Sequence, residues 1–289
     1  MPAAGTPLVI AAVGDVHGHH HQMVALVEQA AAAAGVRPDL VVQVGDFEPH
    51  RHEDDVQTMA APARFRKVGD FPDFREGRAR FPWPVLFVGG NHEPYGFLDG
   101  LAPGAEVAPG CRWLGRAGLV EHCGLKVAGL SGIFREDCWV VGRPPFGAMH
   151  REKKKRYVGF TQADVDRLLD LAEEGRPDLL LLHEWPRLAL GPAEVAQLRM
   201  FVGDESNGDD DELPDLRRVG AVVGSAQALE LALLLEPRLV LCGHVHAPLR
   251  ATLPGGIPLR ALANVEGGVG AVALFLWRAG GGFEELVGP

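Results

Sequence analysis

Five short segments of this chain carry side chains of the kinds that bind metal ions, and each segment directly follows an apolar, strand-like run. The segments comprise residues 14–18, 45–46, 90–93, 183 and 243–246. They offer carboxylate, amide and imidazole groups without a thiolate, a mixture that suits Mn²⁺, Fe, Zn²⁺ or Ni²⁺. Two such ions held about 3.5–4 Å apart can activate a water and neutralise phosphoryl oxygens. These residue types therefore indicate hydrolysis at phosphorus.

Seven side chains in these segments are the predicted metal ligands: Asp15, His17, Asp46, Asn91, His183, His244 and His246. Asp46 is the natural carboxylate to bridge two ions. Asp15 and His17 lie two residues apart in a turn flanked by glycines, so both can reach one metal. Asn91 and His183 offer neutral ligands to the second metal. The two histidines of residues 244–246 can turn toward different metals.

Further side chains near these ligands are candidates for catalysis or for contact with a substrate. His92 follows a predicted ligand and is predicted to be catalytic, since it could donate a proton or stabilise charge in the transition state. Glu93 would orient an imidazole or help to fix the loop. The other candidates for residues around the metals or for substrate contact are Glu48, Arg51, Lys154 and Arg156.

The elements that must position these side chains begin with the apolar runs, which we expect to be strands, at residues 8–13, 40–44, 85–88, 179–182 and 239–242. A helix is expected at residues 21–34, between the first two strands. This strand–helix–strand order predicts a parallel sheet that is covered on both faces. If the five strands share one sheet, their carboxyl ends bring the predicted ligands to one rim.

Two segments interrupt this pattern. Residues 133–160 contain several Gly and Pro and a basic run at residues 151–156, and we expect a long loop that faces the substrate. The basic run fits a solvated surface as well as it fits a phosphate-binding patch. Residues 203–215 are strongly acidic and are expected to form a mobile surface loop. No linker-like boundary is visible, so residues 1–289 are predicted to form a single domain.

The composition excludes some partners. The net charge of the 289 residues is −10, so no global charge attracts the chain to nucleic acid or to an anionic membrane. The longest apolar stretches are strand-sized, and the start lacks the basic region of a signal peptide. The four cysteines show no C-x-x-C spacing, which favours reduced thiols. We therefore expect a cytoplasmic protein without membrane association, and no obligate protein partner is evident.

Several polar or aromatic side chains near the five segments are expected to take no part in the site. The consecutive histidines at residues 19–21 are expected to form a solvated helix start. His50 and His52 are expected at the surface, near the mouth of the site. Trp185 is expected to pack locally rather than to stack on a base.

The five segments together resemble the calcineurin-like metallophosphoesterase superfamily, whose pattern is Gly-Asp-x-His, Gly-Asp, Gly-Asn-His-Glu, His and Gly-His-x-His. The middle of the chain is more specifically similar to the lariat RNA debranching enzymes. That similarity rests on Gly-Asp-Phe-Glu at residues 45–48, Gly-Gly-Asn-His-Glu at 89–93, Ser-Gly-Ile-Phe at 131–134 and His-Glu-Trp-Pro-Arg at 183–187. The resemblance implies an α/β fold, a four-layer αββα sandwich of mixed β-sheets flanked by helices, with the metals at the carboxyl ends of strands.

The resemblance also implies how the ligands are shared. One metal would be bound by Asp15, His17, Asp46 and His246, and the other by Asp46, Asn91, His183 and His244, with His92 as the acid. Residues 133–160 match the loop that in the debranching enzymes helps to recognise branched RNA. Many debranching enzymes carry Cys at the position of Asp15, so this chain has the ordinary two-metal set.

These features predict a binuclear metal-dependent phosphodiesterase in which a metal-bridging hydroxide attacks phosphorus. Two divalent ions are the expected cofactors, with Mn²⁺ foremost and Fe, Zn²⁺ or Ni²⁺ as alternatives. The expected substrate is a phosphodiester of RNA or of a nucleotide. A phosphomonoesterase or protein phosphatase is the alternative within the superfamily, although residues 48–51 match the phosphatase signature poorly. A scaffold with a degenerate site is the alternative outside enzymes, and the complete ligand set argues against it.

Overall fold

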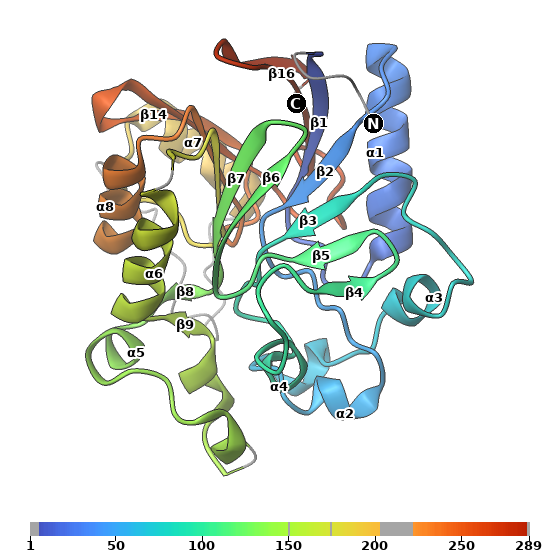
Figure 1. The fold of residues 1–289 in the computed structure, drawn as a ribbon, viewed down its shortest axis with the longest axis vertical. Coiled ribbons are helices and arrows are strands. Elements are labelled where there is room, and N and C mark those ends of the chain that lie inside the picture. Colours follow the sequence, from blue (N-terminus) through green and yellow to red (C-terminus); the bar gives the residue numbers. More distant parts are fainter. Residues whose placement is uncertain (1–5, 150, 174, 203–221, 288–289) are drawn as a thin grey trace.

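The computed structural model describes residues 6–149, 151–173, 175–202 and 222–287, which contain two large β-sheets (Figure 1). The first sheet has seven strands, in the spatial order β17 (Gly282–Val287), β16 (Val272–Arg278), β1 (Leu8–Val13), β2 (Leu40–Gln43), β3 (Val85–Phe87), β5 (Cys111–Trp113) and β4 (Glu106–Ala108). The strands β1, β2, β3 and β5 run parallel, and β16, β17 and β4 are antiparallel to their neighbours. The parallel pairing of β1 with β2 confirms the prediction from strand–helix–strand order.

The second sheet has six strands, in the spatial order β14 (Leu249–Leu253), β15 (Ile257–Ala261), β13 (Leu239–Cys242), β10 (Leu179–Leu182), β7 (Leu125–Leu130) and β6 (Ala117–His122). The five predicted strands are therefore divided, three in the first sheet and two in the second. The condition that all five share one sheet is therefore not met, and the two sheets agree with the sandwich that the family resemblance implies. These strands are apolar on both faces, so two sheets can stack on each other and still be covered by helices on their outer faces.

Successive side chains of each strand point to opposite faces of the sheet, which separates the core into layers. In β1, Leu8 and Ile10 pack between the sheets, whereas Ala11 and Val13 pack with residues of α1 (His20–Ala34). Three helices pack on the outer face of the second sheet, namely α6 (Gln162–Ala172), α7 (Pro192–Val202) and α8 (Ala226–Leu235). In Figure 1, α1 and the pair α6 and α8 lie on opposite sides of the two sheets. This order of layers confirms the predicted αββα sandwich.

Four shorter helices precede or follow the strands that carry the site: α2 (Glu53–Val56), α3 (Phe71–Arg75), α4 (Tyr95–Leu98) and α5 (Glu136–Val141). Thr161 caps α6, since its hydroxyl accepts from the backbone N–H of Asp164 in a capping box. None of the described helices combines the length and the apolar character that a membrane-spanning helix requires.

The segment expected to be one long loop, residues 133–160, is more ordered than predicted. Its two ends pair as parallel strands, β8 (Ile133–Phe134) and β9 (Gly159–Phe160), and α5 lies between them. Arg143 donates to both carboxylate oxygens of Asp164, which ties the segment to the first turn of α6. Gly and Pro interrupt the helical pattern here, so short elements joined by tertiary contacts were not visible in the sequence. The expected acidic loop at residues 203–215 lies outside the described residues.

Candidate metal centre

The predicted ligands come from turns that follow β1, β2, β3, β10 and β13, so both sheets contribute to one site. The carbonyl of Asp46 accepts from the backbone N–H groups of Val16 and His17, which joins the turns after β1 and β2. The ring Nδ1–H of His183, after β10, donates to the carbonyl of Val44 at 3.0 Å and thereby connects the two sheets. This bond also leaves Nε2 of His183 free to point into the site as a ligand.

Four of the ligands adopt backbone conformations that non-glycine residues rarely take. The φ angles are 47° at His17, 50° at Asp46, 68° at His244 and 56° at His246. Left-handed backbone costs energy in residues with a side chain, and such residues cluster at functional sites. The turns are therefore shaped for aiming these side chains rather than for local stability.

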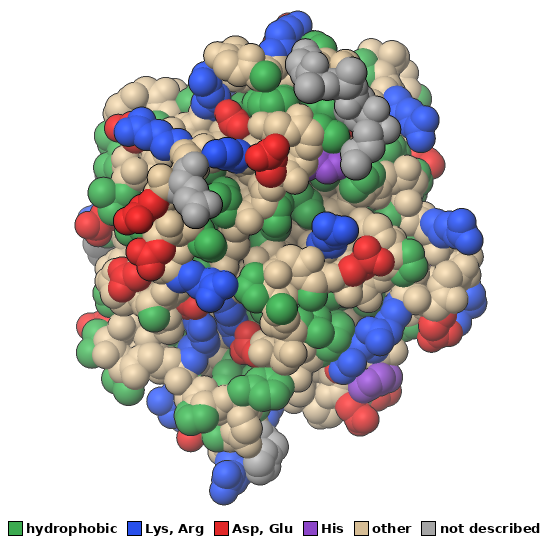
Figure 2. Space-filling model, in the orientation of Figure 1, with side chains coloured by type: hydrophobic (Ala, Val, Ile, Leu, Met, Phe, Trp, Pro, Cys, Tyr) green, Lys and Arg blue, Asp and Glu red, His purple; other side chains and the backbone are tan. Residues whose placement is uncertain are grey.

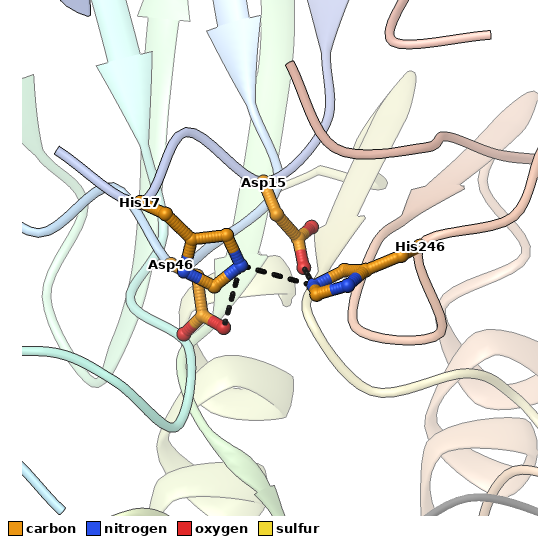
Figure 3. A group of neighbouring side chains, drawn as sticks. All are labelled: Asp15, His17, Asp46 and His246. Atoms are coloured by element: carbon orange, nitrogen blue, oxygen red, sulfur yellow. Dashed lines mark hydrogen bonds and ion pairs between the residues drawn. The ribbon is translucent and has the colours of Figure 1, made fainter. Parts of the chain in front are cut away.

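The first ligand set converges as the sequence predicts. Figure 3 shows Asp15, His17, Asp46 and His246 pointing toward one another, with dashed lines from the His17 ring to both Asp46 and His246. Nε2 of His17 lies 3.0 Å from Nε2 of His246 and 4.0 Å from the Asp46 carboxylate. The Asp15 carboxylate lies 3.0 Å from Nε2 of His246. One donor atom from each residue lies within 4.8 Å of the others, which is the spacing of ligands around one cation.

The second ligand set meets the first at Asp46. Nε2 of His183 lies 3.5 Å from the Asp46 carboxylate and 2.9 Å from Oδ1 of Asn91. The ring of His244 lies beside that of His183, with 4.9 Å between their centroids. The structure therefore brings all seven predicted ligands together around the Asp46 carboxylate.

Glycines beside the ligands are required by close packing. A Cβ atom at Gly45 would overlap the ring of His183, and Gly45 also has a φ of 104°. A Cβ atom at Gly90 would overlap the carboxylate and backbone of Asp46. Only glycine lets these turns approach the ligands of the neighbouring segment so closely.

Glu48 connects three histidines beneath the site. Its buried carboxylate lies 2.9 Å from Nδ1 of His17, 3.6 Å from Nδ1 of His92 and 3.6 Å from Nε2 of His50. Its contact with His17 directs the other ring nitrogen of that histidine toward the metal position, as a carboxylate behind a metal-bound histidine does. His50 is fully buried, so its expected place at the surface is wrong. The buried carboxylate of Glu48, two residues away, is a polar partner that makes burial of the His50 imidazole possible.

Glu93 holds the turn that carries Asp46. Its fully buried carboxylate accepts from the backbone N–H groups of Phe47 at 2.7 Å, Glu48 at 3.0 Å and Gly90 at 3.1 Å. Burial and the neighbouring Asp46 carboxylate raise the pKa of Glu93 to about 8. Glu93 therefore fixes the loop, one of the two roles considered from the sequence, and it does so through backbone groups.

The electrostatics of the site favour bound positive charge. Burial alone would lower the pKa of His17, but its hydrogen bond to Glu48 and the charge of Asp46 raise that pKa to about 10. Burial would also lower the pKa of His92, but the charge of Asp46 and the contact with Glu48 raise that pKa to about 9. Burial and the neighbouring His183 lower the pKa of His244 to about 3, which keeps its imidazole neutral. Divalent cations would replace the protons that these carboxylates attract, so the donor set fits metal ions.

The three basic candidates occupy different surroundings. Arg51 donates to both carboxylate oxygens of Asp55 and lies over the ring of Phe97. Arg156 pairs with Glu152 at 2.8 Å. Lys154 lines a cavity of about 530 Å³ beside Asn91 and His92, and its Nζ donates to the carbonyl of Met149.

The same cavity contains three further cations, Arg66 and two members of the basic run, Lys153 and Lys155. The basic run at residues 151–156 was visible in the sequence. Three of its members, Lys153, Lys154 and Lys155, line the cavity, whereas Arg156 pairs with Glu152. Arg66 carried no motif that could have identified it.

Two other expectations concern residues beside the site. His20 is fully buried, with its ring 4.5 Å from that of Phe47 and its Nδ1 2.9 Å from Asp70. The expected solvated helix start is therefore wrong for His20, because Asp70 from a distant segment gives the ring a buried partner. Trp185 packs locally as predicted, since it is fully buried and donates to the carbonyl of Gly243.

Some known proteins are similar to this chain in sequence, and others are similar in fold. The lariat debranching enzyme of Drosophila melanogaster is 30% identical over 249 residues, which cover 85% of this chain and 44% of that protein. The lariat debranching enzyme of Schizosaccharomyces pombe is 32% identical over 219 residues, which cover 74% of this chain and 44% of that protein. The chain thus spans less than half the length of these relatives. A crystal structure of a protein from Thermus thermophilus has a TM-score of 0.52 at 14% identity, over 98% of this chain and 100% of that chain.

The family comparison agrees with the motifs and with the geometry. The sequence model of the calcineurin-like phosphoesterase family matches residues 8–248, which contain all seven predicted ligands. This match supports the predicted class of enzyme, a phosphoric ester hydrolase that uses divalent metals. The chain belongs to the calcineurin-like phosphoesterase family.

Proposed function

We propose that this chain is a binuclear metal-dependent phosphodiesterase. The observation that carries the proposal is the Asp46 carboxylate, which lies 4.0 Å from Nε2 of His17 and 3.5 Å from Nε2 of His183 and so faces both ligand sets. One ion would be held by Asp15, His17, Asp46 and His246, and the other by Asp46, Asn91, His183 and His244. When bound, the two ions supply an activated water and neutralise phosphoryl oxygens. We propose Mn²⁺ as the metal, with Fe, Zn²⁺ and Ni²⁺ to be tested beside it.

His92 is the residue we assign to the leaving group. It follows the ligand Asn91, lines the cavity, and its side chain is 16% exposed, so a substrate can reach its ring. Its backbone N–H donates to the Asp46 carboxylate at 2.8 Å, which fixes the backbone of His92 relative to the proposed bridging ligand. Glu48 contacts its Nδ1, so Nε2 is the atom that would donate a proton to the departing alkoxide.

RNA or another nucleotide phosphodiester is the substrate class we propose. The relatives in Drosophila melanogaster and Schizosaccharomyces pombe are named lariat debranching enzymes, so RNA with a 2′-5′ linkage is the first substrate to test. A 3′-5′ RNA, a cyclic nucleotide and an aryl diester complete the comparison. A cytoplasmic location stays a prediction.

Two variants test the mechanism with an aryl phosphodiester and Mn²⁺. Asp46→Asn should lose turnover and bound metal together, because both ligand sets use this carboxylate. His92→Ala should retain metal but lose about 10²–10⁴-fold in kcat, the usual contribution of a general acid. His52→Ala is the matched control, since its side chain is 54% exposed and lies outside both ligand sets. Unchanged rates in the first two variants would end this mechanism.

A phosphomonoesterase is distinguished by a paired substrate. The rates on a monoester and a diester of the same alcohol are compared at equal metal loading. A higher kcat/KM on the diester supports the proposal, and a preference for the monoester would move the chain to the phosphatases of the same family.

A further inference from the structure

The cavity beside Asn91 and His92 concentrates positive charge. Its lining includes four cations, Arg66, Lys153, Lys154 and Lys155, and no carboxylate from the described residues. The whole chain carries a net charge of −10, and Figure 2 shows basic and acidic side chains interspersed over the face that it draws. The positive charge of the cavity is therefore a local arrangement and does not reflect the average surface.

The cations come from two walls that are far apart in the sequence. Arg66 follows η1 (Ala63–Phe65), and its Nε donates to the carbonyl of Ala61 at 2.8 Å, which anchors the guanidinium at one wall. Lys153 and Lys155 flank Lys154 on the opposing segment, and both are exposed. Lys154 is held by the carbonyl of Met149. Arg66, Lys153 and Lys155 are thus the cations best placed to meet a ligand.

The size of the cavity exceeds the needs of one phosphate. Its volume is about 530 Å³, within the range of about 300–1,000 Å³ that holds a whole small molecule. Pro62 from the segment of Arg66 and Val158 from the segment of the lysines add apolar atoms to the lining, which suits a sugar or a base. A planar guanidinium with ammonium groups opposite matches the geometry and charge of a phosphate.

We propose that this cavity binds a second phosphate of the substrate, on the nucleotide next to the bond that is cleaved. Arg66 and Lys155 are then specificity-determining residues, and the substrate is an oligonucleotide with at least two phosphates. This inference rests on the proposed phosphodiesterase function. A small aryl diester or a cyclic mononucleotide lacks the second phosphate and leaves the cavity unused.

The test compares two dinucleotides that differ by one group. Each contains the same internal phosphodiester, and one of them also carries a terminal phosphate. In the unchanged protein with Mn²⁺, we expect the terminal phosphate to raise kcat/KM about fivefold, the combined effect of two exposed charge pairs. Arg66→Gln and Lys155→Gln should each reduce this gain while hydrolysis of the dinucleotide without the terminal phosphate is kept. Lys67→Gln and Arg151→Gln are matched controls, since both residues are exposed neighbours outside the cavity lining.

Salt dependence provides a second measurement. Binding of a longer single-stranded oligonucleotide to the His92→Ala variant should weaken with salt, and adding Arg66→Gln should reduce the slope of log K against log salt by about 0.7. Equal rates on the two dinucleotides, or equal losses on both in Arg66→Gln, would overturn the subsite. An enzyme that hydrolyses the aryl diester yet ignores the terminal phosphate overturns the subsite alone. A protein without any diesterase activity overturns both proposals.

Discussion

The hydrogen bonds of Glu93 yield a quantitative prediction about how the site is held. Oε1 accepts from Phe47 and Gly90, and Oε2 accepts from Glu48. In Glu93→Gln, an amide oxygen in the place of Oε1 keeps two of these bonds, while the amide NH₂ faces the N–H of Glu48. One bond is lost and two donors oppose each other, which should cost about 1–3 kcal/mol in the free energy of unfolding.

Glu93→Ala removes all three acceptors. Three buried N–H groups then lack a partner and the side chain leaves a cavity, so we expect a cost of about 3–6 kcal/mol. Such a cost approaches the total stability of many domains, about 5–15 kcal/mol, and the variant is expected to be at the limit of folding. The other variant, Glu93→Gln, also removes the ionisable carboxyl group. Because the pKa of Glu93 is raised to about 8, this loss of charge adds little to the free energy of unfolding that the Gln variant loses.

The assay is urea unfolding of metal-free protein at pH 7, which separates stability from metal binding. Glu106→Gln is the control, because its side chain is 51% exposed. Equal destabilisation by Gln and Ala at position 93, or a cost below about 1 kcal/mol for Ala, would refute the idea that these three bonds hold the turn. Metal binding measured on the Gln variant should weaken, because the Asp46 turn is less well fixed.

Three further predictions use other parts of the structure. Gly45→Ala should abolish metal binding because the new Cβ overlaps His183, whereas Gly35→Ala, also at positive φ but with open space around it, should cost only about 1–2 kcal/mol in urea unfolding. Burial opposes ionisation of Asp164, but the hydrogen bonds from Arg143 outweigh it and lower the pKa. Because the pKa of Asp164 is lower in the folded state, its carboxylate stabilises the fold at a pH above 3.8, the pKa in the unfolded chain, and this stabilisation is lost as the pH falls toward the pKa of the folded state. Asp164→Asn should therefore reduce the acid dependence of the melting temperature below about pH 4. Removing metal with a chelator should lower the melting temperature, and added Mn²⁺ should restore it, because cations bound only by the native state stabilise it; no change would show that the buried carboxylates bind no ion.

Local sequence determined most of the elements and singled out the candidate ligands. Strands β1, β10 and β13 have the predicted bounds, since short apolar runs that end in Gly or a polar turn have few alternatives. Candidate metal ligands can also be recognised in the local sequence. Asp, Asn and His are costly to bury in apolar surroundings, so their presence directly after buried strands indicates that they have a chemical role there. The spacing of Asp15 and His17 was sufficient to predict that both donor atoms reach one cluster of possible metal ligands.

Tertiary structure decided which distant segments meet. The division of the strands into two sheets depends on which strands pair. Strand β10 pairs with β7 and β13 in the second sheet, although its apolar pattern fits either sheet. The burial of His20 beside Asp70 depends on a partner from a distant segment, which no local pattern specifies. His50 has its partner Glu48 only two residues away, and what the sequence left open is that the turn carrying both lies in the interior. The cavity wall at Arg66 arises in the same way. A buried polar side chain pairs with whichever polar group the fold brings within a few ångströms. Its neighbours therefore follow from the packing of the whole chain and cannot be read from its position in the sequence.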